Sequence, residues 1–525
     1  MDPAALRAAM ARPDFYPHRP DSVEVVHTHA SVVFLAGPFV YKVKKPVDFG
    51  FMDFSTLEKR RENCRREVEL NRRLAPSVYL GVAEICEDAS GSLSLEGPGE
   101  VVEYAVHMKR LDEGGVFKSL LLRGELTPDH LTRLAKLLAD FHARAATGGE
   151  IDRAGRLSCV EKNHEENFAQ IEPYVPAVLE AEKLNLLIAY ADWFMLKRRR
   201  LFDRSVEEGR IRDCHGDLHL AHVVLHEGEI VVFDCIEFNE RFRYSDVAAE
   251  AAFLAMDLEY NHAPELADHF VDAYVSASGD RRLVVLLDFY KAYRATVRGK
   301  VLCFETDQEG VPEKERKKAA EAAARYFDLA ARCACRPLRP RMVLLSGPTA
   351  TGKSALAGHL ARLLGAQILQ TDVIRKELFG MAPTQKRAEP VDQGIYSAEA
   401  TERTYAEMHR RAKELLAAKK SVIMDASYRR RDHRQEAAAI AHKARGRVFL
   451  VECEAPEEEI RRRLGLRKKD PAAVSDGRWE VYLAQKRSWE PANEVPREQK
   501  IRMDTSRASP GECACRILRK MLYQR

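Results

Sequence analysis

The chain has 525 residues, of which 46% are hydrophobic and 31% are charged, and its formal net charge is +4. This length predicts more than one domain, and the composition is that of a globular rather than a disordered protein. The small net charge argues against a nucleic-acid partner, no apolar run reaches the roughly 18 residues of a membrane span, and the N-terminus shows no secretory signal.

The eleven cysteines are sparse for this length and do not form a disulfide framework. Cys333 with Cys335 and Cys513 with Cys515 are C-x-C pairs without a matched second pair nearby, which argues against a zinc site. We interpret the cysteines as reduced thiols of a cytoplasmic protein.

The first part of the chain predicts a small sheet with a helix, followed by a largely helical region. Residues 108–111 leave a strand in the way that is typical of a hinge between two lobes. Strands are expected at 23–26, 32–35, 39–43 and 101–107. Helices are expected at 56–74, 127–146, in most of 161–208, and from about 246 to 333.

Lys42 lies within the third of these strands, on the same face as Val40 and Lys44. A lysine inside an apolar strand usually has an anionic partner, and Glu67 on the following helix suits a kinase-type ion pair. Lys42 would then hold the α- and β-phosphates of a nucleotide. The alternative interpretation is an edge-strand lysine in water.

Two carboxylates define the chemical centre of this half. Asp217 lies in the loop His-Gly-Asp-Leu-His, and Asp234 ends a short apolar strand 17 residues later. This arrangement suits phosphoryl transfer, with Asp217 orienting or deprotonating a substrate hydroxyl and Asp234 holding Mg²⁺ against the phosphates.

These two motifs, together with Lys42 and Glu67, resemble the aminoglycoside phosphotransferase group of kinases over roughly residues 20–300. The resemblance implies a protein-kinase-like bilobal α+β domain with a small sheet lobe and a helical lobe. That group has Asn as a second Mg²⁺ ligand five residues after the catalytic Asp, where this chain has His222. Imidazole is a poor partner for Mg²⁺.

His222 leaves several interpretations open for the N-terminal half. It is a second small-molecule kinase, weak or using another ligand such as Glu237 or Asn239, or it is a binding domain that has lost its chemistry. A transition-metal site built from His215, His219 and His222 is a further alternative.

Three later features of this half have plain structural interpretations. Asp246 either caps a helix or holds the catalytic loop. Arg294 and Arg298 share a helix face, which is most often solvated. Residues 336–341 are basic and proline-rich and predict a linker, with a kinase-like domain at 1–335 before it and a second domain at 342–525 after it.

The second domain opens with the pattern G-x-x-x-x-G-K-[ST] between an apolar strand and an amphipathic helix, and in that context the pattern is strong evidence for a P-loop. The amides of such a loop wrap a phosphate, while Lys353 reaches the β- and γ-phosphates and the Ser354 hydroxyl binds Mg²⁺. The motif consists of Gly347, Pro348, Thr349, Ala350, Thr351, Gly352, Lys353 and Ser354.

Strands and helices alternate through this domain, which predicts a parallel sheet flanked by helices, as in P-loop NTPases. Functional groups of such sheets gather beyond the carboxyl ends of the strands. Strands are expected at 342–346, 366–369, 421–424, 448–452 and 500–503, and the overall fold class is α/β with two domains.

Two aspartates follow these strands. Asp372 is our candidate for orienting or activating the acceptor hydroxyl, with a helix N-cap as the alternative. Asp425 ends an apolar strand in the Walker B manner, close to Mg²⁺ or, alternatively, to substrate.

Several arginines are candidates for binding substrate or closing a lid over the transferred phosphoryl group. An ordinary solvated helix face is the alternative for the run at 461–463. Residues 504–506 are either the segment beside the adenine or a polar turn. The four arginine candidates are Arg375, Arg429, Arg463 and Arg467.

The Walker A box, Thr-Asp-x-x-Arg at 371–375 and Asp-Ala-Ser-Tyr at 425–428 are similar to P-loop kinases of small molecules, polynucleotide ends and the zeta-toxin type. The order of the halves resembles bacterial fusions of an aminoglycoside phosphotransferase-like domain with an ATP-binding domain. The resemblance implies an ATP- and Mg²⁺-dependent phosphotransferase acting on a small-molecule hydroxyl acceptor. The alternatives are a regulatory ATP-binding or ATP-hydrolysing protein and a nucleic-acid-end kinase.

Overall fold

The computed structural model describes residues 3–50, 52–308, 311–338, 341–385, 393–469 and 474–524. Contacts divide the chain into two compact units, residues 1–163 with 198–294 and residues 164–197 with 295–525. None of the helices in the described ranges combines the length and apolar character needed to cross a membrane. All eleven cysteines are free thiols.

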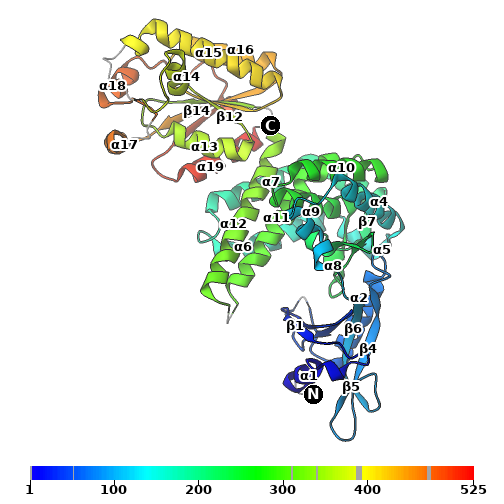
Figure 1. Cartoon of the computed structure of the whole chain (residues 1–525). Helices are drawn as coiled ribbons and strands as arrows, with labels where there is room; N and C mark the ends of the chain where they lie inside the picture. The colour runs from blue at the N-terminus through cyan, green and yellow to red at the C-terminus, as the bar shows by residue number, and fades with distance from the viewer. Residues whose placement is uncertain are drawn as a thin grey trace. The chain divides into compact units, whose positions relative to one another are not determined.

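The first unit begins with a six-stranded antiparallel sheet in the order β1-β2-β3-β6-β4-β5, on which α2 packs (Figure 1). The structure contains the strands predicted at 23–26, 32–35, 39–43 and 101–107 and the helix predicted at 56–74. The elements α1, β4 and β5 were not predicted. The elements are α1 (Pro3–Met10), β1 (Val23–His27), β2 (Ser31–Ala36), β3 (Phe39–Lys44), α2 (Leu57–Asn71), β4 (Tyr79–Glu87), β5 (Leu93–Leu95) and β6 (Glu100–Lys109).

The rest of the first unit is mainly helical, and strands of two short pairs flank the loop that carries Asp217. β7 pairs with β10, and β8 with β9, both antiparallel. The elements up to the loop are α3 (Phe117–Leu122), α4 (Pro128–Arg144), α5 (Gly149–Ala154), α6 (Leu157–Ile171), α7 (Ala181–Glu207) and β7 (Ile211–Asp213). Those after it are β8 (Val223–His226), β9 (Glu229–Val232), α8 (Glu240–Arg243), β10 (Tyr244–Asp246), α9 (Val247–Tyr260), α10 (Pro264–Ser278), α11 (Leu283–Thr306) and α12 (Glu313–Cys335). By the division of contacts, α12 and parts of α6, α7 and α11 belong to the second unit.

The second unit contains a five-stranded, fully parallel sheet in the order β12-β13-β11-β14-β15. The helices α13 and α19 cover one face, and α15 and α16 cover the other (Figure 1). Its strands are β11 (Arg341–Ser346), β12 (Gln367–Gln370), β13 (Val422–Asp425), β14 (Arg447–Glu454) and β15 (Lys500–Asp504). Its helices are α13 (Lys353–Leu364), α14 (Thr371–Leu378), α15 (Ala398–Ala417), α16 (Arg431–Lys443), α17 (Glu457–Lys469), α18 (Trp479–Arg487) and α19 (Pro510–Tyr523).

The predicted two-domain α/β layout is confirmed, and all five strands predicted for the second domain are present within one or two residues. The boundary at 336–341 stays a prediction. Residues 336–338 form a 3₁₀ turn, residue 341 begins β11, and residues 339–340 lie outside the described part.

Candidate functional sites

The P-loop joins the central strand β11, which is buried along its whole length, to the first turn of α13. Gly347 has φ +147°, and a Cβ there would lie 2.5 Å from the carbonyl oxygen of Cys453. Gly352 has φ +85° just before the helix starts. Both positions therefore require glycine, and the loop places Lys353 and Ser354 at the helix N-terminus, where an anion is stabilised.

Lys353 folds back onto its own loop. Its Nζ donates to the carbonyl oxygens of Gly347 at 2.8 Å and Pro348 at 2.7 Å. Burial lowers the pKa of Lys353, and the nearby Asp425 carboxylate only partly opposes that effect. The ammonium group is therefore poorly compensated, and a phosphate would supply the missing negative charge.

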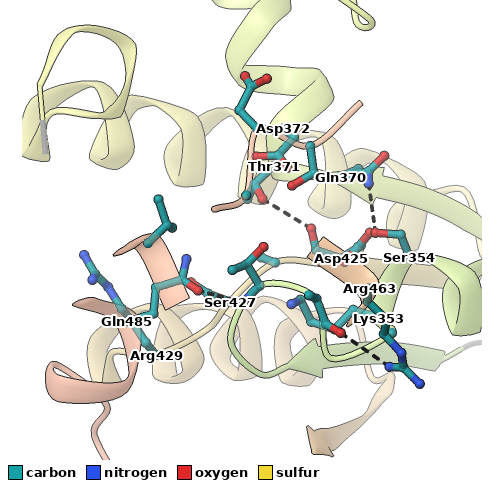
Figure 2. Close-up of a pocket in the computed structure, with 18 of the residues that line it drawn as sticks. Lys353, Ser354, Gln370, Thr371, Asp372, Asp425, Ser427, Arg429, Arg463 and Gln485 are labelled. Atoms are coloured by element: carbon teal, nitrogen blue, oxygen red, sulfur yellow. Dashed lines mark hydrogen bonds between the residues drawn. The ribbon is translucent and has the colours of Figure 1, made fainter. Parts of the chain in front are cut away.

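Asp425 and Ser354 lie next to each other at the P-loop (Figure 2). Asp425 is 3% exposed, and its Oδ2 has no hydrogen-bond partner. The Ser354 hydroxyl accepts a hydrogen bond from Gln370 Nε2 at 3.1 Å. Burial raises the pKa of Asp425, against the charge of Lys353 and a hydrogen bond with Ser354. An orphaned carboxylate oxygen beside a serine hydroxyl is a donor set that fits Mg²⁺.

Asp372 and Arg375 lie on α14, one turn apart, and both line the same cavity. Asp372 is the second residue of the helix, and the residue at the cap position is Gln370. Arg375 is 6% exposed, and its Nη1 donates to the Ile395 carbonyl oxygen at 2.7 Å and to Thr401 Oγ1 at 3.2 Å. Its Nε has no partner, so this buried guanidinium retains an unused donor.

The three remaining arginine candidates have different surroundings. Arg463 donates to Thr505 O at 2.7 Å and to the P-loop carbonyl of Ala350 at 3.3 Å, so it ties the P-loop to the segment after β15. Arg467 Nη1 lies 3.4 Å from Thr349 Oγ1. Arg429 donates to Ser488 Oγ at 2.8 Å.

The residues around the P-loop and those on α14 line one cavity of about 850 Å³. One part of its lining comes from the P-loop, Arg463 and Thr505, and another from Asp372 and Arg375. Sequence reasoning missed Gln485 on α18, whose side-chain oxygen accepts from the Thr349 amide at 2.7 Å. No sequence motif marks Gln485, and the helix α18 that carries it was not predicted.

In the first unit, Lys42 makes the predicted ion pair. Its Nζ lies 2.9 Å from Glu67 Oε1 and 2.9 Å from Asp234 Oδ1. Lys44, which was not predicted as a site residue, bridges the other oxygen of Glu67 at 2.7 Å and also pairs with Glu237. Although burial opposes it, the two lysine charges hold the pKa of Glu67 below its usual value.

Asp234 occupies a strained backbone position with φ +62°, a left-handed conformation that costs a non-glycine residue about 1 kcal/mol. The chain is held there by neighbours, since the Asp234 amide donates to Tyr79 Oη at 3.2 Å and the next amide, of Cys235, donates to Asn71 Oδ1 at 2.9 Å. This support directs the Asp234 carboxylate toward Lys42.

His222 lies beside Asp217 and Asp234. Its Nδ1 donates to the backbone oxygen of Asp217 at 2.9 Å, and its Nε2 lies 3.5 Å from Asp234 Oδ2. Burial, reinforced by the neighbouring His219, lowers the pKa of His222 to about 4. The ring is therefore neutral near pH 7, and a nitrogen donor here does not fit Mg²⁺.

The loop that carries Asp217 is anchored by Glu250, which sequence reasoning missed. Its Oε1 accepts from the amides of His215 at 2.8 Å and Gly216 at 2.7 Å, and its Oε2 lies 2.7 Å from His142 Nε2. Asp246 is the N-cap of α9, accepting from the Ala248 amide. The expected solvated face for Arg294 is wrong, because Arg294 is 7% exposed and donates to the Gly216 carbonyl oxygen at 3.2 Å.

The fold and the two sites define a chain with a kinase-like unit and a P-loop unit, and the comparisons agree. Residues 39–285 match the family model described as phosphotransferase enzyme family, and residues 342–492 match the one described as AAA domain. Over 483 residues the chain is 33% identical to the uncharacterized proteins Rv2004c of Mycobacterium tuberculosis (strain ATCC 25618 / H37Rv) and Mb2027c of Mycobacterium bovis, covering 91% of this chain and 94% of each relative. The chain belongs to the same family as these mycobacterial proteins.

Solved structures similar to the chain each cover about a third of it. An unliganded sugar kinase from Janibacter sp. HTCC2649 is 20% identical, covering 34% of this chain and 92% of that one, with a TM-score of 0.27. The Mycobacterium tuberculosis APS kinase CysC in complex with AMPPNP and APS is 21% identical, covering 35% and 99%, with a TM-score of 0.25. Because both TM-scores lie below 0.5, we draw nothing from these likenesses.

Proposed function

We propose that the P-loop half is an ATP- and Mg²⁺-dependent phosphotransferase that acts on a hydroxyl acceptor. The observation that carries this proposal is the buried, unpartnered Oδ2 of Asp425 beside Ser354, next to Lys353, whose ammonium group donates to two carbonyl oxygens of its own loop. MgATP would satisfy all three groups, because its phosphates would bind Lys353 and its metal ion would bind Ser354 and Asp425.

Asp372 would orient the acceptor hydroxyl, and catalysis would come mostly from positioning and charge stabilisation. Arg375 supports an acceptor that also carries an anionic group, because its buried guanidinium has no carboxylate within 4 Å in the described residues and retains an unused Nε donor. A buried cation of this kind gains most from a carboxylate, sulfate or phosphate ligand.

Arg467 is the arginine best placed to neutralise the transferred phosphoryl group, because its guanidinium reaches the P-loop at Thr349. Arg463 would instead hold the P-loop and the segment beside the adenine in place, since its donors are engaged by Ala350, Thr505 and Glu459. Arg429 also lines the cavity and would contact the acceptor.

The first unit is proposed as a second small-molecule kinase, on the strength of the Lys42–Glu67–Asp234 ion pairs. Lys42 would hold nucleotide phosphates and Asp217 would present the hydroxyl.

The test is phosphate transfer from labelled ATP to a panel of hydroxyl compounds, with and without an anionic group, and to oligonucleotides. Lys353→Ala and Asp217→Ala are compared with wild type, and Lys413→Ala on α15 is the exposed-lysine control. We expect a labelled anionic acceptor and loss of label in Lys353→Ala. Turnover of ATP with no labelled acceptor would favour the regulatory alternative. Label on oligonucleotide ends would favour the nucleic-acid-end kinase. Unchanged label in Lys353→Ala would contradict the proposal.

A further inference from the structure

In the first unit, His222 and Asp234 each direct an atom with a free lone pair toward the other, Nε2 of the ring and Oδ2 of the carboxylate. A carbonyl oxygen only accepts hydrogen bonds, so the contact of His222 Nδ1 with Asp217 O requires the hydrogen on Nδ1. The lone pair of the neutral ring is then on Nε2, 3.5 Å from Asp234 Oδ2. The other oxygen of this carboxylate, Oδ1, is engaged by Lys42 Nζ at 2.9 Å.

The separation of these donors matches two ligands of one metal ion better than a hydrogen bond. It exceeds the usual N–H···O range of about 2.7–3.2 Å. Two donors bound at about 2.1 Å to a tetrahedral ion are about 3.4 Å apart, whereas neighbouring donors on octahedral Mg²⁺ are about 3.0 Å apart. The His222–Asp234 distance of 3.5 Å is therefore closer to the tetrahedral value.

The chemistry of the donors points the same way. Imidazole nitrogen suits Zn²⁺, Fe²⁺ and Ni²⁺ best; Mn²⁺ is the weakest-binding of the divalent transition-metal ions but accepts nitrogen more readily than Mg²⁺, which prefers oxygen. His219 does not offer Nε2 in its present tautomer, because its Nδ1 accepts from the Ala221 amide at 3.3 Å. Two protein ligands would then leave the remaining positions of the ion to water and to phosphate oxygens.

We propose that the first unit binds a divalent transition-metal ion through His222 Nε2 and Asp234 Oδ2, in preference to Mg²⁺. This site would give the N-terminal half a metal requirement different from that of the P-loop half, whose Ser354 and Asp425 offer only oxygen. The inference does not depend on the function proposed for the P-loop.

The test uses the full chain carrying Ser354→Ala, which removes the proposed P-loop metal ligand, and titrates it with MnCl₂ or MgCl₂ alone. Electron spin-echo modulation of bound Mn²⁺ reports directly coordinated imidazole nitrogen. We expect nitrogen modulation, and we expect His222→Asn to abolish it and to lower the Mn²⁺-to-Mg²⁺ affinity ratio at least about tenfold.

His226→Asn, at a partly exposed histidine on β8, is the matched control and should keep both the signal and the ratio. Thermal unfolding of each variant checks that it is folded. Absence of nitrogen modulation in the Ser354→Ala protein, or an unchanged affinity ratio in folded His222→Asn, would overturn the proposal.

Discussion

Asp425 carries an energetic cost in the absence of a cation. It is almost fully buried, its Oδ2 has no partner, and burial raises its pKa. A carboxyl group whose folded pKa is raised favours the folded state at low pH, and this contribution is lost as the pH rises through the folded pKa. Such unfavourable groups persist where function requires them, and here the function we propose is metal binding.

The change Asp425→Asn should therefore separate stability from activity. Removing the buried charge should raise the thermal unfolding temperature of the nucleotide-free protein above pH 7 and remove this pH-dependent component. The same change should lower the rate of phosphate transfer at least about a hundredfold, because metal-assisted charge stabilisation contributes several kcal/mol. Differential scanning calorimetry and the labelled-ATP assay measure the two effects. Lower stability together with full activity would contradict this account.

At the scale of the element, helix α9 supports the catalytic loop through one side chain. Burial alone would raise the pKa of Glu250, but hydrogen bonds from His142 and from the loop amide of Gly216 lower it to about 2. Because the folded pKa is depressed, the stabilisation is present above the unfolded value of about 4.3 and is lost as the pH falls toward 2. The loop carrying Asp217 is thus fixed by a buried acid 33 residues away.

Glu250→Gln should loosen this anchor. We expect a loss of about 2–4 kcal/mol in the stability of the first unit at pH 7, because charged hydrogen bonds in a buried network are removed. The loss should shrink as the pH falls below about 4.3, because the carboxyl group then takes up its proton in the unfolded chain before it does so in the folded protein. Urea unfolding at pH 7 and pH 3 measures this, with Glu265→Gln on the exposed side of α10 as the control. An equal loss at both pH values would show that Glu250 acts through packing alone.

The contrast between Lys353 and Glu250 shows what the sequence predicts. The P-loop, Lys42 and Asp425 were predictable because their roles are encoded locally, in a motif or in a strand followed by an acid. Glu250 lies within an apolar helix and has no such signal, and its partners come from α4 and from the loop after β7. Lys44 was overlooked although it lies on the same strand face as Lys42, because the expected pairing of one lysine with one glutamate left no role for a second lysine; the structure gives it Glu67 and Glu237 as partners.

At the scale of the whole molecule, the chain contains two candidate phosphate-binding sites in separate compact units. Each has its own lysine, Lys42 with Glu67 and Lys353 in the P-loop. They differ in the residues that we propose as metal ligands, a histidine and an aspartate in the first and a serine and an aspartate in the second. We therefore expect two nucleotide-binding events per chain with different metal requirements.

The most direct test of the central claim is calorimetric titration of the full chain with a non-hydrolysable ATP analogue and Mg²⁺, comparing wild type, Lys353→Ala and the exposed-lysine control Lys413→Ala. The account predicts that Lys353→Ala weakens one binding event at least about a hundredfold, as expected when a charge-assisted contact to phosphate worth about 3 kcal/mol is lost. The control should bind as wild type does. Wild-type protein that does not bind the analogue, or Lys353→Ala that binds it with unchanged affinity and stoichiometry, would contradict the claim.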